Sequence, residues 1–264
     1  MTSTTSRTLA SYPDLTITLD ESGSGRPVLV LHGGGGPATV TGIAEHLAGT
    51  GRVLLPTHPG WNGTARPAWL TDVATLADLY LELLKNEGLS GVALVGSSVG
   101  GWLAAEMAAR DTAGLIGALI VVDGVGITVP DEPIRDFFAL DARGVAEYSY
   151  YDAERFYIDP ATLTEAQVAA RIANMATLRV YAGDPYMHDP SLAARLAAVT
   201  VPTLVLWGEA DRIGTPGYGR AFAAAIPGAR FEIVERAGHL PQLEQPETTF
   251  GAIDAFLKDS GLES

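Results

Sequence analysis

The sequence contains no cysteine, so disulfide bonds, thiolate metal ligands and a cysteine nucleophile are all excluded. Basic residues are also scarce: 17 lysines and arginines stand against 31 aspartates and glutamates, and the formal net charge is −14 at pH 7. Such a chain repels nucleic acid and anionic membrane surfaces, and we expect neither as a partner. The five histidines include no His-x-x-x-His pair, so we expect no metal site.

Long apolar runs are absent as well, so no segment is expected to cross a bilayer. The amino terminus lacks the apolar core of a signal peptide, and we expect residues 1–11, rich in serine and threonine, to be disordered. The chain has 264 residues, 47% of them hydrophobic, which is enough for a large core. These features predict a cytoplasmic protein, and they leave a homodimer open as its assembly.

What the chain does contain is a series of short apolar runs separated by helical segments. Runs of this kind predict strands buried on both faces of a parallel sheet. A further segment, residues 15–19, alternates polar and apolar residues and predicts an antiparallel edge strand. Repeated alternation of strands and helices with short connections predicts an α/β fold, with helices on both faces of a mostly parallel sheet. The apolar runs stand at residues 27–31, 52–56, 92–95, 119–122, 202–207 and 230–234.

This alternation stops between residues 126 and 200, where no buried-strand run occurs. The segment instead holds short amphipathic helical stretches with many aromatic residues, together with Met175 and Met187. We predict that residues 126–200 are an inserted helical cap with an apolar roof, and that residues 1–125 and 201–264 form the core domain. Ordinary helical covering of the sheet is the alternative.

Ser98 lies at a sharp turn between an apolar strand and a helix, within the pattern Gly96-x-Ser98-x-Gly100. Glycines two residues before and after the serine allow a turn so tight that a Cβ there would clash. The turn raises the serine hydroxyl above the sheet, and the helix start directs its free N–H groups toward it. A glycine-rich strand–helix turn without catalytic function is the alternative.

A serine hydroxyl needs a base to take its proton, and that base needs an acid to orient it. Asp211 and His239 follow two later strands, and the carboxyl ends of parallel strands meet at one edge of a sheet. We therefore predict Ser98, His239 and Asp211 as nucleophile, base and acid. Asp123 and Glu209 remain alternative acids. The two histidines at earlier strand ends, His32 and His58, are interpreted as structural.

The glycine-rich loop at residues 33–36 is the candidate for an oxyanion hole. Such a hole needs two backbone N–H donors, each of which lowers the barrier by about 3 kcal/mol. We predict that Gly34 and Val99 supply them, with Gly35 as an alternative donor or a pocket residue. Trp61 and Ser97 are further candidates for the pocket lining.

Four motifs together resemble the α/β-hydrolase fold superfamily. They are His-Gly-Gly-Gly-Gly at 32–36, Gly-Ser-Ser-Val-Gly at 96–100, Gly-Glu-Ala-Asp-Arg at 208–212 and Gly-His-Leu-Pro at 238–241, the last followed by Glu-Gln-Pro at 244–246. The resemblance implies a mostly parallel eight-stranded sheet, a helical cap after the sixth strand and no cofactor. It also implies that Ser98, His239 and Asp211 form the catalytic triad, because serine, acid and histidine follow one another in that order.

The sequence is most similar to capped esterases and carbon–carbon bond hydrolases of that superfamily. The serine at position 98 departs from haloalkane dehalogenases and epoxide hydrolases, which carry aspartate there. Leu240 follows the histidine, where many hydrolases of aromatic ring-cleavage products carry tryptophan. No arginine of the cap stands out as a carboxylate clamp, although Arg135, Arg155 and Arg179 remain candidates.

These features predict a serine hydrolase of apolar, small-molecule carboxylic esters or lactones. Three alternatives remain open. The first is a carbon–carbon bond hydrolase that uses the same three residues, and the second is a ligand-binding protein of the same fold without hydrolytic activity. The third is a lyase or a cofactor-free peroxidation catalyst that uses the same three residues.

Overall fold

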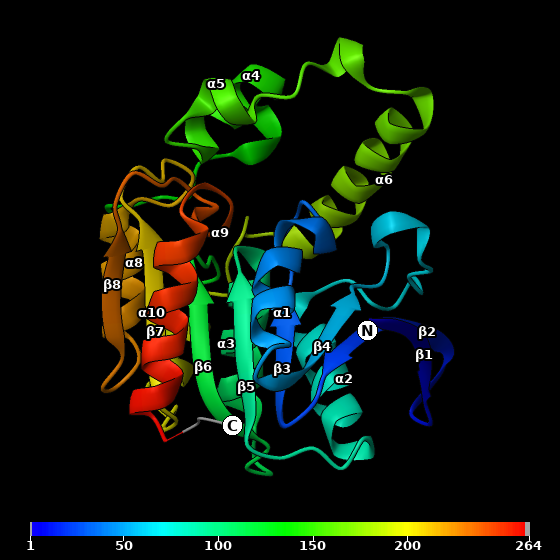
Figure 1. Ribbon diagram of the computed structural model, residues 1–264. Helices are drawn as coiled ribbons and strands as arrows, with labels where there is room; N and C mark the ends of the chain where they lie inside the picture. The colour runs from blue at the N-terminus through cyan, green and yellow to red at the C-terminus, as the bar shows by residue number, and fades with distance from the viewer. Residues whose placement is uncertain (1, 262–264) are drawn as a thin grey trace.

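A twisted sheet of eight strands runs through the computed structural model, which describes residues 2–261 (Figure 1). The strand order is β1-β2-β4-β3-β5-β6-β7-β8; the pairs involving β2 are antiparallel and all others are parallel. The prediction of a mostly parallel, eight-stranded sheet is therefore confirmed. The strands are β1 (Ser3–Leu9), β2 (Tyr12–Gly23), β3 (Arg26–Leu31), β4 (Gly51–Thr57), β5 (Val92–Ser97), β6 (Ile116–Val122), β7 (Thr203–Gly208) and β8 (Arg230–Val234).

Disorder over residues 1–11 is wrong for most of that segment, because β1 pairs with β2 along its whole length. Serine and threonine suit a half-exposed strand, since their side chains fit the pleated surface without a core to bury. Arg7 fixes β1 further by pairing with Glu21 of β2 and with Glu87, which caps the C-terminal end of the helix Val73–Asn86. Met1 lies outside the described residues.

The predicted edge strand at residues 15–19 lies within β2 and is not at the edge. β2 has β1 on one side and β4 on the other, so β1 takes the edge position. At the opposite end of the sheet, β8 is the second edge.

Helices cover both faces of the sheet because adjacent strand residues point to opposite sides. In β3, Val28 and Val30 belong to one apolar cluster, and Leu29 and Leu31 belong to the other. The first cluster contains residues of α1 (Thr41–Leu47) and α10 (Pro246–Asp259), and the second contains residues of α2 (Val73–Asn86), α3 (Val99–Arg110) and α8 (Pro216–Ala224). Figure 1 shows α1 and α10 together in front of the strands.

Between β6 and β7 the described chain contains no strand, as the sequence pattern predicts. Figure 1 shows α4 and α5 above one end of the sheet, while the long α6 extends away from them. That this segment acts as a cap domain over residues 126–200 remains a prediction. Its helices are α4 (Ala142–Ser149), α5 (Ala153–Phe156), α6 (Glu165–Ala182) and α7 (Leu192–Leu196), with 3₁₀ turns at Phe137–Ala139 and Pro160–Thr162.

Two further 3₁₀ turns, Pro37–Thr39 and Trp61–Gly63, follow β3 and β4, and the short α9 (Pro241–Glu244) follows β8. These turns, the turn after β5 and the loop after β7 all lie at the carboxyl ends of parallel strands. None of the described helices is both long and apolar enough to cross a membrane.

Candidate active site

Ser98 is the single residue between the end of β5 and the start of α3, and its backbone has φ 58° and ψ −121°. A left-handed conformation at a residue other than glycine costs about 1–3 kcal/mol, and the surrounding structure must enforce it. The two flanking glycines permit the turn. A Cβ on Gly96 would lie 2.1 Å from the carbonyl oxygen of Gly100, and one on Gly100 would lie 2.1 Å from that of Leu31.

Three side chains form a continuous hydrogen-bonded series at this turn. The Ser98 Oγ lies 2.9 Å from Nε2 of His239, and Nδ1 of that histidine lies 2.8 Å from Oδ2 of Asp211. A carboxylate only accepts, so Nδ1–H donates to Asp211 and Nε2 is left to accept the proton of the serine. The structure thus brings together the three residues that the sequence pattern predicts.

The local backbone holds Asp211 and His239 in place. Oδ1 of Asp211 accepts hydrogen bonds from the N–H groups of Ile213 and Gly214, at 2.8 and 3.2 Å. The N–H of His239 donates to the carbonyl of Ser149 in α4, at 2.7 Å. Both side chains are buried, whereas Ser98 is half-buried. This arrangement can remove a proton from Ser98 and stabilise the imidazolium that results.

The predicted oxyanion loop passes directly beside the serine. A Cβ on Gly33 would lie 2.8 Å from the Cβ of Ser98. The N–H of Gly34 shares a peptide with the carbonyl of Gly33, which accepts a hydrogen bond from the N–H of Gly36 at 3.1 Å. The carbonyl of Gly34 accepts one from Nε1 of Trp61 at 3.0 Å, which orients the next peptide, the one that carries the N–H of Gly35. Val99 is the first residue of α3, so its N–H has no acceptor within the helix. Gly34 and Val99 thus offer backbone donors at the turn; their role in catalysis remains a proposal.

His32 and His58 are hydrogen-bonded to each other and to the start of the glycine-rich loop at residues 33–36. The N–H of His58 donates to Nε2 of His32 at 3.0 Å, and Nδ1 of His32 lies 2.7 Å from the carbonyl oxygen of Gly33. His58 in turn bonds Tyr80 and the carbonyl of His32. Burial lowers the pKa of His32 to about 4, and burial together with His32 lowers the pKa of His58 well below its ordinary value. Both rings are therefore neutral structural groups at neutral pH.

The remaining candidates for the pocket lining are enclosed by the protein. Trp61 is 1% exposed and stacks on Tyr181 of α6, with ring centroids 5.2 Å apart. Ser97 is also 1% exposed, and its Oγ accepts a hydrogen bond from Nε2 of Gln242 at 3.2 Å. Gly35 packs toward Thr39, because a Cβ on Gly35 would lie 2.6 Å from Cγ2 of that threonine. The structure therefore places the side chains of Trp61 and Ser97 in the supporting packing.

Neither alternative acid is hydrogen-bonded to His239 among the described residues. Glu209 is exposed and accepts a hydrogen bond from the N–H of Arg236. Asp123 is buried at the end of β6, where its Oδ1 accepts a hydrogen bond from the N–H of Gly208 at 2.9 Å. Among the described residues, Asp123, Asp211 and His239 form the one group of such side chains that could share a metal ion. His239 and Asp211 already bond to each other, so proton transfer is the simpler use of this group.

Gln242 and Glu244 join the loops of the site, although the sequence pattern indicates no function for either residue. Glu244 accepts hydrogen bonds from the N–H groups of Gly238 (2.6 Å), Tyr151 (3.1 Å) and Asp152 (3.0 Å). Nε2 of Gln242 donates to the carbonyl of Thr39 at 3.1 Å and also to Ser97, as described above. The Glu-Gln-Pro motif marks Glu244, but no periodicity shows which backbone groups lie opposite it.

The segment after β6 contacts both sides of the serine. At the histidine side, a Cβ on Gly238 would lie 2.3 Å from the carbonyl oxygen of Ser149. At the oxyanion side, a Cβ on Gly34 would lie 2.7 Å from Cδ2 of Leu178 in α6. Helices of this segment therefore border the site from two directions.

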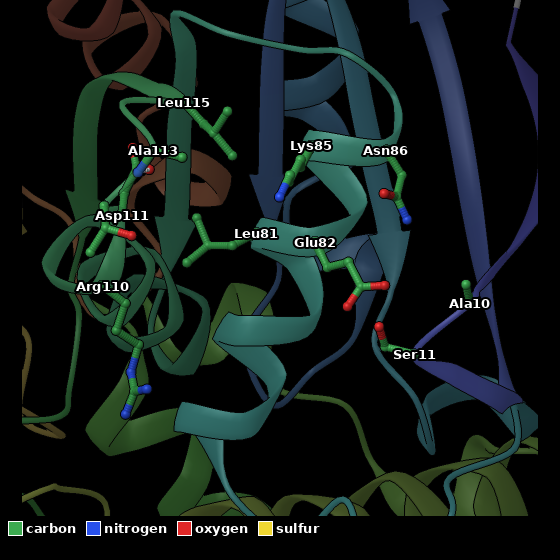
Figure 2. A pocket seen from close by; sticks show the side chains of 11 residues that line it. Ala10, Ser11, Leu81, Glu82, Lys85, Asn86, Arg110, Asp111, Ala113 and Leu115 are labelled. Atoms are coloured by element: carbon green, nitrogen blue, oxygen red, sulfur yellow. Dashed lines mark hydrogen bonds between the residues drawn. The ribbon is translucent and has the colours of Figure 1, made fainter.

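A surface hollow of about 500 Å³ lies elsewhere, between the C-terminal ends of α2 and α3 and the turn at residues 10–11 (Figure 2). Its charged lining includes Arg110, which pairs with Glu106 and Asp78. The helices run antiparallel to the strands, so this hollow is at the opposite end of the sheet from Ser98. We do not consider it the active site.

Comparisons with known proteins agree with this fold. A sequence model of the alpha/beta hydrolase family matches residues 28–252. A 2-hydroxy-6-oxononadienedioate/2-hydroxy-6-oxononatrienedioate hydrolase of Cupriavidus pinatubonensis is 28% identical, over 90% of this chain and 89% of its own. Lipase 3 of a Moraxella species is 27% identical, over 95% of this chain and 83% of its own.

Among solved structures, a thermophilic esterase from Thermogutta terrifontis superposes with a TM-score of 0.71 and 26% sequence identity. The superposition covers 98% of this chain and 99% of the esterase. The match to the family extends from β3 to α10 and includes all four motifs of the site. The chain belongs to the alpha/beta hydrolase family.

Proposed function

We propose that the protein is a serine hydrolase of small, apolar carboxylic esters or lactones. The observation that carries this proposal is the hydrogen-bonded series from Ser98 through His239 to Asp211. A buried ligand-binding site has no need for a serine whose proton is directed at an oriented imidazole. The relatives support hydrolysis as the general reaction, since an esterase, a lipase and a dienedioate hydrolase are among them.

In the proposed mechanism, Oγ of Ser98 attacks the carbonyl carbon of the ester while Nε2 of His239 takes the hydroxyl proton. Asp211 stabilises the imidazolium through Nδ1–H. The carbonyl oxygen becomes an oxyanion, which the N–H groups of Gly34 and Val99 stabilise by about 3 kcal/mol each. The imidazolium then protonates the leaving alcohol, and an acyl-enzyme remains on Ser98. Water attacks this ester with the same base, releases the acid and restores the serine.

Three observations favour esters over the carbon–carbon bond substrates of the alternative. The Cupriavidus relative acts on a dianion, yet no arginine is a hydrogen-bond partner of Ser98 or His239 among the described residues. The three candidate arginines of the cap are instead stacked on aromatic rings. The distances from the arginine Cζ to the ring centre are 4.3 Å for Arg135 on Tyr148, 4.1 Å for Arg179 on Phe138 and 5.2 Å for Arg155 on Phe156. Leu240 also follows the histidine, where many ring-cleavage hydrolases carry tryptophan.

The test is hydrolysis of p-nitrophenyl butyrate by the wild-type protein and by Ser98→Ala. Loss of the nucleophile is expected to lower kcat by about 10⁶-fold. A fluorophosphonate probe should label the wild-type protein and not the variant. Ser90→Ala is the matched control, because Ser90 is exposed in the loop before β5. Equal rates for wild type and Ser98→Ala would reject the proposal.

A substrate panel separates esters from the alternative. The panel contains p-nitrophenyl esters of increasing acyl length, a lactone and a 2-hydroxy-6-oxodienoate. Turnover of esters or lactones without turnover of the dienoate supports the proposal. Turnover of the dienoate alone would establish the carbon–carbon bond hydrolase instead.

A further inference from the structure

Asp123 is a fully buried carboxyl group that the proposed mechanism does not use. It follows β6, and its backbone is held in the left-handed region with φ 46°. Its N–H donates to the carbonyl of Leu206, and its Oδ1 accepts from the N–H of Gly208, so both contacts fix it against the end of β7. A strained backbone at a buried polar residue such as Asp123 is typical of functional sites.

The other carboxyl oxygen of Asp123 is unsatisfied. Oδ2 is buried and has no hydrogen-bond partner among the described residues. One oxygen of Asp123, one oxygen of Asp211 and one ring nitrogen of His239 all lie within 4.8 Å of one another. An unpaired carboxylate oxygen so close to another carboxylate is unfavourable, whereas a protonated one can donate to it.

The surrounding charges decide which of the two carboxyl groups carries the proton. The titratable groups facing Asp123 are Asp211 in the loop after β7, His239 in the loop after β8, and Glu244 in α9. Asp211 receives two backbone N–H groups and the imidazole, whereas Asp123 receives a single N–H. Burial, and after it the charge of Asp211, raises the pKa of Asp123 well above its ordinary value. The proton therefore belongs on Asp123.

We propose that Asp123 is a positioning residue that stays protonated at neutral pH, directs its Oδ2–H toward the carboxylate of Asp211, and acts on His239 through that carboxylate. This rests on the proposed function, because it assigns Asp123 a task within the same site. The donated hydrogen bond limits rotation of Asp211. It also withdraws negative charge from Asp211, so the imidazolium of His239 is less stabilised and the base remains neutral to lower pH.

The first experiment measures protonation directly. At neutral pH, the infrared difference spectrum between the wild-type protein and Asp123→Asn should show the carbonyl band of a protonated carboxylic acid that the variant lacks. Asp131→Asn, which alters an exposed aspartate, is the matched control and should leave that band in place. Absence of the band from the wild-type protein would overturn the proposal. This measurement does not depend on hydrolysis, so failure of the proposed function would not affect it.

The second experiment measures the effect on the base, by the pH profile of kcat/KM for p-nitrophenyl butyrate. Asp123→Asn keeps a neutral donor, and asparagine tolerates the left-handed backbone. We expect its acidic limb to coincide with that of the wild-type protein. Asp123→Ala removes the donor, so its acidic limb should move to higher pH. Its kcat should fall about tenfold or more with little change in KM, because misplacing a catalytic group by 1 Å costs up to about 100-fold.

The sign of the shift discriminates between the possible functions of Asp123. An acidic limb that moves to lower pH in Asp123→Asn would mean that an ionised carboxylate had been lost, which overturns the proposal. An unchanged acidic limb in Asp123→Ala would leave Asp123 a purely structural group, which also overturns it. If Asp123→Ala does not fold, the infrared band and the pH profile of Asp123→Asn still decide.

Discussion

At the scale of single residues, His32 shows how hydrogen bonds determine a protonation state. Its Nε2 must be unprotonated, because it accepts the N–H of His58, and its Nδ1 must carry the proton, because the carbonyl of Gly33 only accepts. A second proton would remove the first of these bonds and place a charge in the core. The interpretation of this histidine as structural follows from its place at a strand end, but its tautomer requires the structure.

This depressed pKa makes the stability of the protein depend on pH. Below pH 6.5 the unfolded chain binds a proton at His32 that the folded chain excludes until about pH 4, so stability is complete above this window and falls as the pH drops through it. The full loss from this residue is about 3 kcal/mol. Urea unfolding at a series of pH values should show this decline. In His32→Asn, which keeps a donor to Gly33, the decline over the same window should be smaller. An equally steep decline in the variant would contradict the assignment.

At the scale of elements, the short helix α9 links four parts of the site through Gln242 and Glu244. Glu244 joins the histidine loop to the turn between α4 and α5, and Gln242 joins α9 to the serine turn and to the turn after β3. These contacts set the position of His239, although neither side chain is hydrogen-bonded to its ring. Their effect on the site is therefore geometric.

Glu244→Gln tests this link. The carboxylate accepts three backbone N–H groups, whereas an amide has a single acceptor oxygen and presents an NH₂ group to the remaining donors. We expect a loss of about 2–3 kcal/mol in unfolding free energy, because buried N–H groups lose a charged acceptor. We also expect kcat to fall, because the histidine loop is less fixed. Thermal unfolding and p-nitrophenyl butyrate hydrolysis measure the two effects.

The matched control is Glu247→Gln, which makes the same change at an exposed position in the first turn of α10. It should alter neither measurement appreciably, because a single exposed charge near a helix start contributes less than about 1 kcal/mol. Equal effects of the two substitutions would show that the three hydrogen bonds of Glu244 do not position the loop.

The elements that could be predicted from the sequence are those that their own residues identify, without knowledge of the neighbouring strand. The strands β3 to β7 are recognisable because each is an apolar run buried on both faces, and β5 is buried along its whole length. β1 was missed because Leu9 is its one buried residue, so its partner rather than its composition makes it a strand. Because the sequence does not reveal β1, it places β2 at the edge of the sheet, a position that β1 occupies in the structure.

The same distinction holds for the site. Ser98, Asp211 and His239 could be predicted as neighbours, because each follows a strand of one parallel sheet and the order of the motifs is informative. Gln242, Glu244 and the proposed function of Asp123 depend on which backbone groups and carboxylates lie opposite them. That information is in the three-dimensional packing and not in any spacing along the chain.

At the scale of the whole molecule, the segment between β6 and β7 is attached to the core at several places, two of which lie beside the loops of the site. The turn between α4 and α5 is held at the histidine loop by Glu244. The second half of α6 is held at the loop after β4, where Thr177 Oγ1 donates to the carbonyl of Gly60 at 2.9 Å and Tyr181 donates to that of Pro59 at 3.2 Å. The segment is therefore held to the core both beside the histidine loop and beside the loop after β4.

The two halves of α6 differ in how they are supported. Residues 165–173 are exposed on all sides, and Ile172 is 65% exposed, whereas Leu178 and Tyr181 are 3% and 1% exposed. Local unfolding is most favourable where few apolar contacts form. Amide hydrogen exchange followed by mass spectrometry should therefore show fast exchange in peptides from the first half and slow exchange in peptides from the second half. Thr177→Val removes the hydrogen bond to Gly60 and should accelerate exchange in the second half alone.

Uniform protection from hydrogen exchange along α6 would contradict this expectation, and its dependence on protein concentration would show the cause. Residues 165–173 are exposed within the described chain, so protection there would require either contact with another molecule or a helix that is stable on its own. A second copy of the chain would give protection that increases with protein concentration, as expected for the homodimer left open by the sequence. Protection in the first half that is independent of concentration would mean that the helix is stable on its own. Its capping box, formed by Thr164 and Gln167, would then be the feature that holds it, and Thr164→Ala should remove that protection.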